Sequence, residues 1–68
     1  MMRINWQSRR HFSAEIEPGI GPRSGQWRWT LYLRDEIVAS DYAPDRNAAM
    51  AAAGLMADQT ARPRLVSA

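Results

Sequence analysis

The sequence predicts an α+β protein in which a three- to four-stranded antiparallel sheet is covered on one face by a single alanine-rich C-terminal helix. Segments 12–17 and 27–34 alternate apolar and polar residues with a period of two, which is typical of strands with one covered face. After Pro44 the composition favours a helix, because residues 48–53 are all alanine except Met50. One helix covers only one side of a sheet, so the other side is either solvated or available to a partner.

The first strand is expected at residues 2–8, where Ile4 and Trp6 alternate with polar side chains. The pattern favours a separate or strongly bent strand that turns at Arg9 and Arg10. The alternative is a bent extension of the strand that follows.

The second and third strands are expected at residues 12–17 and 27–34. The segment between them contains three glycines and two prolines, which favours a loop. Alternation along the third strand places its apolar residues on one face, namely Trp27, Trp29, Leu31 and Leu33. The opposite face then carries Arg28, Thr30, Tyr32 and Arg34.

The fourth strand is expected at residues 37–42, in a hairpin that turns at Asp35 and Glu36. Asp-Glu is a poor two-residue turn, because the favoured hairpin turns need positive φ and usually contain glycine or asparagine. The alternative is a longer connection that includes Arg34. It would change which face of the sheet the first residues of the fourth strand occupy.

The helix is expected at residues 44–60, with Pro44 in its first position and Asp45 at the positive end of its dipole. The predicted inner stripe consists of Ala48, Ala52, Leu55 and Gln59, with Ala51 and Met56 at its edges. Small side chains let the helix lie close to a sheet that supplies bulk from its tryptophans and leucines. The tail, residues 63–68, either frays or adds a short edge strand.

The 68 residues are expected to form one small domain, because a chain of this length buries only about 60% of its unfolded surface. The net charge of +2 divides into +4 over residues 1–34 and −2 over residues 35–68, and every basic residue is arginine. The sequence contains no cysteine, no export signal and no apolar run near the roughly 20 residues that cross a bilayer. We therefore expect a cytoplasmic protein that has no contact with a membrane.

Catalytic and metal-binding chemistry is not expected. The chain has one histidine, His11, and its carboxylates fall mostly on solvent-facing strand positions, turns and helix ends rather than in a cluster. A chain this short has little room for an enclosed substrate pocket. The sequence predicts a protein that is not an enzyme and that carries no cofactor and no metal.

Recognition of a partner is the function that remains, and the uncovered sheet face is its predicted site. Arginine and tyrosine are enriched at interface hot spots, which singles out Arg28, Thr30, Tyr32 and Arg34 on that face. A second, smaller basic patch contains Arg9 and Arg10 with Arg3. Trp6 is either part of the core or an exposed interface anchor.

Residues 12–59 resemble a recognised type of small domain. The pattern Trp27-x-Trp29-x-Leu31, then Ile37-Val38-Ala39-Ser40, then an alanine-rich helix resembles hairpin-plus-helix domains of bacterial and phage orphan proteins. The architecture is similar to the amino-terminal domains of tyrosine integrases and to AP2 domains, which place the sheet against DNA. In size and composition the chain is similar to phage-encoded inhibitors, including anti-CRISPR proteins.

These observations together predict a non-enzymatic binding module, an inhibitor from a phage or mobile element that occupies a surface of a protein or nucleoprotein partner. The first alternative is a nucleic-acid-binding domain, which Glu15 and Glu17 disfavour because they lie beside the arginines of the sheet face. The second alternative is a structural subunit that forms a homodimer through an open sheet edge or through Trp6.

Overall fold

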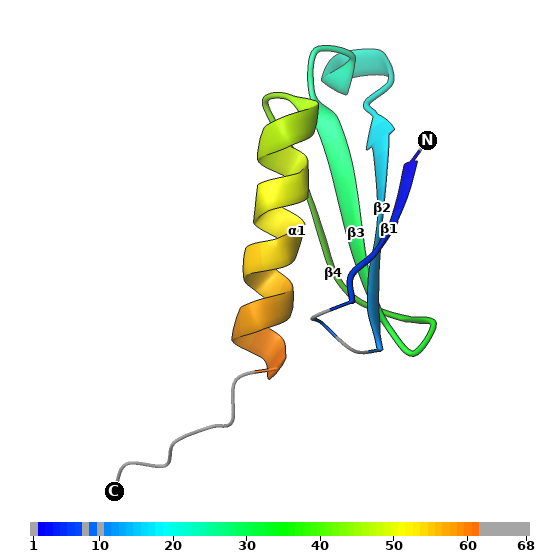
Figure 1. Cartoon of the computed structure of the whole chain (residues 1–68). Coiled ribbons are helices and arrows are strands. Elements are labelled where there is room, and N and C mark those ends of the chain that lie inside the picture. The colour runs from blue at the N-terminus through cyan, green and yellow to red at the C-terminus, as the bar shows by residue number, and fades with distance from the viewer. Residues whose placement is uncertain (1, 8, 10, 62–68) are drawn as a thin grey trace, which may run out of the picture.

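The computed structural model describes residues 2–7, 9 and 11–61, and these contain four strands and one α-helix. The elements are β1 (Met2–Asn5), β2 (Phe12–Pro18), β3 (Trp27–Leu33), β4 (Glu36–Ala43) and α1 (Arg46–Ala61). The strands pair antiparallel in chain order, β1-β2-β3-β4. Helix α1 lies along one face of this sheet (Figure 1), which confirms the predicted α+β architecture.

The hydrophobic core lies between α1 and the apolar faces of β2 and β3. Ile16 is paired with Trp29 and Ala14 with Leu31, so these four side chains form two adjacent rows on the covered face. Ala14, Ile16 and Leu31 are completely buried, and Trp29 is nearly so. The period-two alternation of β3 therefore assigned its covered face correctly.

The buried face of α1 differs from the predicted stripe. Ala49, Ala53 and Ala57, spaced four residues apart, are the completely buried positions, whereas Leu55 is 60% exposed. The prediction is therefore wrong for Leu55 and Gln59, which are exposed, whereas Ala48 and Ala52 are partly buried and pack against the core. The reason is steric: with only methyl groups against Trp29, the helix axis can lie closer to the sheet than a leucine would allow.

Helix α1 begins at Arg46, two residues later than predicted, because Asp45 caps it. Asp45 Oδ1 accepts a hydrogen bond from the Ala48 backbone N–H at 2.7 Å, and its carbonyl accepts one from the Ala49 N–H at 3.0 Å. An aspartate at this position satisfies an amide that has no partner inside the helix. Pro44 therefore lies outside the helix.

The β3–β4 hairpin turns at Arg34 and Asp35, whose φ angles of 51° and 71° match a two-residue turn with both central residues in the left-handed region. The predicted turn at Asp35 and Glu36 is wrong by one residue, and β4 begins at Glu36. A register shift between Leu31 and Tyr32 leaves Val38 as an extra residue in β4.

The amino-terminal strand is a separate strand, since β1 pairs antiparallel with β2, with Ile4 opposite Ala14. It ends at Asn5, so the predicted extension through Trp6 and Gln7 is wrong, and Ser8 lies outside the described residues. Arg10, part of the predicted turn, and the tail at residues 63–68 lie outside the described residues. In the described part of the chain, no helix is long and apolar enough to span a bilayer.

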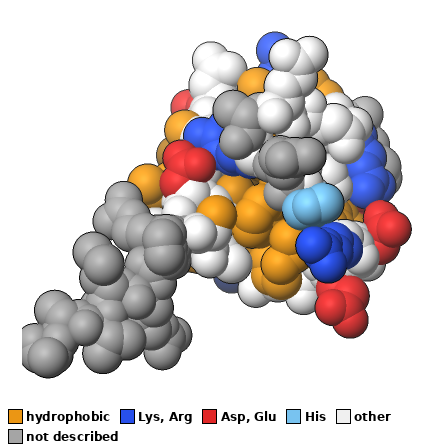
Figure 2. All heavy atoms as spheres, turned by 60° about the horizontal axis from the view of Figure 1, so that its bottom comes forward, with side chains coloured by type: hydrophobic (Ala, Val, Ile, Leu, Met, Phe, Trp, Pro, Cys, Tyr) orange, Lys and Arg blue, Asp and Glu red, His pale blue; other side chains and the backbone are white. Residues whose placement is uncertain are grey.

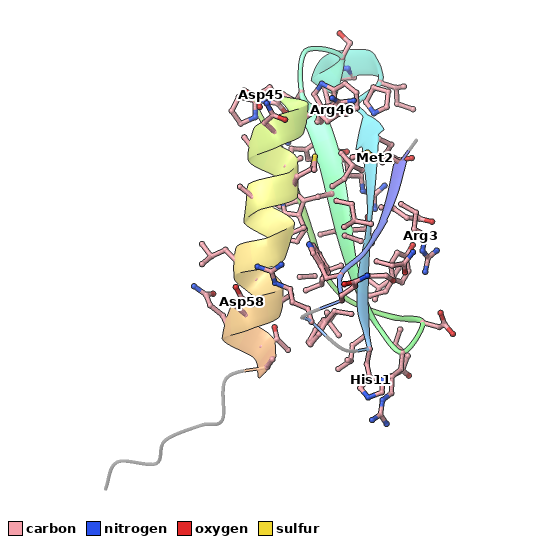
Figure 3. All side chains as sticks on the ribbon, viewed as in Figure 1. Met2, Arg3, His11, Asp45, Arg46 and Asp58 are labelled. Atoms are coloured by element: carbon pink, nitrogen blue, oxygen red, sulfur yellow. The ribbon has the colours of Figure 1, made fainter. Side chains whose placement is uncertain are left out.

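Arg9 links the β1–β2 connection to α1. Its Nε and Nη2 atoms donate hydrogen bonds to the two carboxylate oxygens of Asp58, at 2.8 and 3.0 Å, and its guanidinium lies 5.0 Å from the centroid of the Trp6 ring. Asp58 raises the pKa of Arg9 above its usual value, chiefly through this hydrogen bond. Figure 3 shows Asp58 on the side of α1 that faces the β1–β2 connection.

Gly54 is the helix residue over which Arg9 passes. A Cβ at this position would lie 3.3 Å from Arg9 Nη2, tighter than an ordinary van der Waals contact. The glycine therefore leaves room for the Arg9 guanidinium at a buried point of α1.

The close approach of Arg9 predicts a non-additive response to Gly54→Ala. Glycine costs about 1 kcal/mol relative to alanine in a helix interior, so Gly54→Ala should stabilise an Arg9→Ala variant by roughly that amount. In the wild-type background the gain should be smaller, because the new methyl group displaces Arg9. Urea unfolding followed by tryptophan fluorescence measures both values.

Ala51→Gly is the matched control, because Ala51 is an exposed position of the same helix. Its cost should be equal in the two backgrounds. An equal gain from Gly54→Ala with and without Arg9 would contradict the proposed contact.

A candidate interface on the uncovered sheet face

The face of the sheet turned away from α1 carries alternate residues of all four strands. Arg28, Thr30 and Tyr32 of β3 lie on this face, as the alternation predicted. The register places beside them Arg3 and Asn5 from β1, Ser13, Glu15 and Glu17 from β2, and Ile37, Ser40 and Tyr42 from β4.

The centre of this face is closed by a polar network. Tyr32 OH donates a hydrogen bond to Glu15 Oε1 at 3.0 Å, while Arg3 donates to Glu15 Oε2 at 3.3 Å and to Ser13 Oγ at 3.1 Å. The Arg3 guanidinium also lies 5.2 Å from the centroid of the Tyr32 ring. Arg3 extends on the side of the sheet opposite α1 (Figure 3), so the network covers the face that the helix does not.

The network and its neighbours bury the short side chains beneath them. Thr30 is only 6% exposed and Ser13 only 9%, although neither lies under the helix. The aliphatic and aromatic parts of long polar side chains thus replace a second layer of structure. Thr30, predicted as a contact residue, offers little surface to a partner.

Arg28 is the more accessible arginine of β3. Its closest carboxylate oxygen is Glu17 Oε2 at 4.0 Å, and the Arg28 side chain is 44% exposed. Within the described residues the Arg28 guanidinium makes no hydrogen bond, so its donors remain available. An exposed pair at this distance contributes little to stability.

Exposed large hydrophobic side chains lie along the β4 side of the face. Ile37 is 64% exposed, Tyr42 is 36% exposed, and Ile20, in the loop after β2, is 84% exposed. We call these three residues the apolar strip. The extra residue Val38 matters here, because it brings Ile37 opposite Tyr32 and so onto the uncovered face.

A shallow pocket of about 200 Å³ lies at the loop end of the strip. Its lining consists of Glu17, Pro18, Gly19, Ile20, Arg28 and Tyr42. Arg23 stands over the Tyr42 ring, 4.6 Å from its centroid, and donates a hydrogen bond to Gln26 Oε1 at 3.1 Å. The pocket therefore has a mostly polar surface, with Arg28 in its lining and the Arg23 guanidinium nearby on the Tyr42 ring.

The loop between β2 and β3 places Arg23 and Ile20 at this end. It contains a short 3₁₀ helix, Gly21–Arg23, and the Gly19 N–H donates a hydrogen bond to the Gln26 carbonyl at 2.8 Å. A Cβ on residue 19 would collide with the Arg23 carbonyl oxygen, and Gly21 has a φ of 61°. Both positions therefore require glycine.

The other residues predicted for partner binding lie elsewhere. Arg34 is in the β3–β4 turn rather than on the strand face, because its positive φ ends the alternation. That end of the molecule comes forward in Figure 2, where hydrophobic side chains reach the surface beside His11. Trp6 packs against the core and Arg9 is held by Asp58, and Arg10 is outside the described residues.

The predicted contact residues did not include Ile20, Arg23, Ile37 or Tyr42, and Arg3 was expected in a basic patch with Arg9 and Arg10 rather than on the sheet face. Tyr42 follows Ser40 with a period of two, so alternation along β4 places both on one face. The positions of Arg23 and Ile20 depend on the loop conformation. Neither periodicity nor composition reports that conformation.

No group of three or more His, Asp or Glu side chains suited to a metal ion occurs among residues 2–7, 9 and 11–61.

No protein-family model, curated protein or solved structure matches this chain.

Tyr32 provides a direct test of the polar network. The hydrogen bond to Glu15, partial desolvation and the Glu15 charge raise the pKa of Tyr32 above its usual value of 10.0. A raised pKa in the folded state means that the stabilising interaction is present at neutral pH and is lost as the pH rises through the Tyr32 pKa. In a Tyr42→Phe background, where Tyr32 is the remaining tyrosine, absorbance titration should show this raised value.

The substitution Glu15→Gln should lower the Tyr32 pKa towards 10.0, because it removes the charge that opposes ionisation. The control Glu17→Gln should lower it less, since Glu17 acts only through a weaker Coulombic interaction. A Tyr32 pKa that is insensitive to Glu15→Gln would contradict the network.

Proposed function

We propose that the protein is a non-enzymatic binding module that occupies a surface of a protein partner through the β3–β4 half of its uncovered sheet face. The observations that carry this proposal are the exposed side chains of Ile37 and Tyr42 on β4, and of Ile20, which lines a shallow pocket together with Tyr42. Grouped exposed hydrophobic side chains with polar neighbours are typical of interaction sites. Arg28 and Tyr42 are of residue types enriched at interface hot spots.

The charge on the face favours a protein partner over a nucleic acid. Glu15 is bound to Arg3 and Glu17 lies near Arg28, so most of the positive charge on the sheet is balanced. Nucleic-acid binding depends on several basic groups that each neutralise a phosphate. Near this face Arg23 adds positive charge without a carboxylate within 4.0 Å in the described residues, whereas Arg34 and Arg46, which also lack one, lie in the β3–β4 turn and at the start of α1.

The sheet edges are poorly suited to pairing with another strand. The edge strand β1 has only four residues, and β4 is interrupted by the bulge at Val38. In addition, Asp41 Oδ1 accepts the Tyr42 backbone N–H at 2.8 Å, which occupies a donor on the edge strand. Short edges, bulges and edge carboxylates all discourage strand addition, so the face is the better site for association.

A stable interface of ordinary size buries about 800 Å² per partner, roughly a sixth of the 5111 Å² accessible surface of this chain. Such an interface would include the apolar strip and Arg28 together. A small module that covers this much of a partner could inhibit it by obstruction alone. Inhibition of a phage-defence or other host complex is the form of this function that the size and composition favour.

Site-specific photo-crosslinking tests the proposal. A benzophenone amino acid at Tyr42 should give a discrete protein adduct in a lysate of the source organism. The same group at Leu55 should not, although Leu55 is exposed and lies on the outer side of α1. The adduct should survive nuclease treatment, and its identity would show whether the partner belongs to a defence complex.

Three results would contradict the proposal. One is adduct formation at Leu55 but not at Tyr42. Another is loss of the Tyr42 adduct after nuclease treatment, which would favour the nucleic-acid alternative. The third is a Tyr42 adduct with the mass of two copies of this chain, which would favour the self-associating alternative.

A further inference from the structure

We propose that the pocket beside Tyr42 accepts a carboxylate side chain from an acidic, extended segment of the protein partner. This inference rests on the proposed function and specifies the chemistry of its contact. The pocket is the point of the uncovered face where Arg28 and the Tyr42 ring, with Arg23 stacked on it, come together.

Arg28 supplies the first recognition group. Arg28 lines the pocket, and its Nη1 lies 4.0 Å from Glu17 Oε2, too far for a hydrogen bond. A guanidinium presents its N–H donors in a planar fork that matches a carboxylate. An incoming carboxylate can therefore form with Arg28 the short hydrogen bonds that Glu17 does not form.

Arg23 supplies the second cationic group. Stacking on Tyr42 at 4.6 Å and the hydrogen bond to Gln26 at 3.1 Å hold it in place, so little of its conformational freedom is lost on binding. The charges of Arg23, Arg28 and Glu17 sum to one net positive charge. The loop end of the face is thus complementary to an anion, in contrast to the neutral Arg3–Glu15 pair at its centre.

The pocket has the size and the lining to accept one side chain from the partner. About 200 Å³ holds only a few water molecules, since each takes about 30 Å³ of liquid volume. Pro18, Ile20 and Tyr42 offer apolar surface to the methylene groups of a glutamate and to an apolar neighbour along the partner segment. A nucleic-acid backbone would bring further phosphates against Glu17 and Glu15, which disfavours it.

Peptide titration followed by the protein's amide resonances tests this inference. The probes are two capped peptides, acetyl-Gly-Leu-Glu-Leu-Gly-amide and its counterpart with Gln in place of Glu. The Glu peptide should saturably shift the amide signals of Gly19, Ile20, Arg28 and Tyr42. The Gln peptide should bind at least threefold more weakly, on the order of what a partly exposed ion pair contributes.

Two variants with the same change of charge complete the experiment. Arg28→Gln should abolish the preference for the Glu peptide. Arg46→Gln should retain it, because Arg46 is an exposed arginine at the start of α1 and does not line the pocket. Circular dichroism should show that both variants keep the fold.

The inference is overturned by equal binding of the two peptides, by the absence of saturable shifts at the pocket amides, or by stronger shifts from a single-stranded oligothymidine. Its failure is distinguishable from failure of the proposed function. A nuclease-resistant adduct at Tyr42 together with no Glu preference would retain the protein-binding role and remove only the carboxylate contact.

Discussion

The contact between the alanine face of α1 and the Trp29–Leu31 layer of β3 is the constraint on which the rest of this structure depends. Three methyl groups at Ala49, Ala53 and Ala57 bring the helix close to the sheet, and aromatic and branched side chains from the strands fill the space between them. Within the described residues α1 is the single α-helix, so the sheet has helical cover on one face only. The opposite face must be stabilised by its own side chains.

The two halves of the opposite face differ in how their side chains cover the sheet. Near β1 and β2, the Arg3, Glu15 and Tyr32 network balances its charges and buries Thr30 and Ser13. Near β4, the strip of exposed apolar side chains has no such cover. The proposed interface lies on the β3–β4 half.

The sequence predicted the strands and the helix that have a periodic or compositional pattern. It did not predict the features that depend on contacts between these elements. The alternation in β3 predicted which of its faces is covered, and the alanine content predicted the helix. The rotation of α1 could not be predicted, because an alanine-rich segment has apolar residues on several sides and only the bulk of Trp29 selects among them. The turn at Arg34 and Asp35 was anticipated only by the alternative that includes Arg34, because arginine rarely adopts a left-handed φ. The pocket depends on the β2–β3 loop conformation, so Arg23 and Ile20 carried no sequence signal.

The stability of two leucine variants tests the central contact most directly. Ala53→Leu should lower the free energy of unfolding by about 1 to 3 kcal/mol, because the added atoms enter a filled space against the sheet. Ala51→Leu, two residues away on the exposed side of α1, should change the free energy of unfolding by no more than about 0.5 kcal/mol. Equal effects of the two substitutions, or stabilisation by Ala53→Leu, would contradict the helix orientation and with it the assignment of the uncovered face.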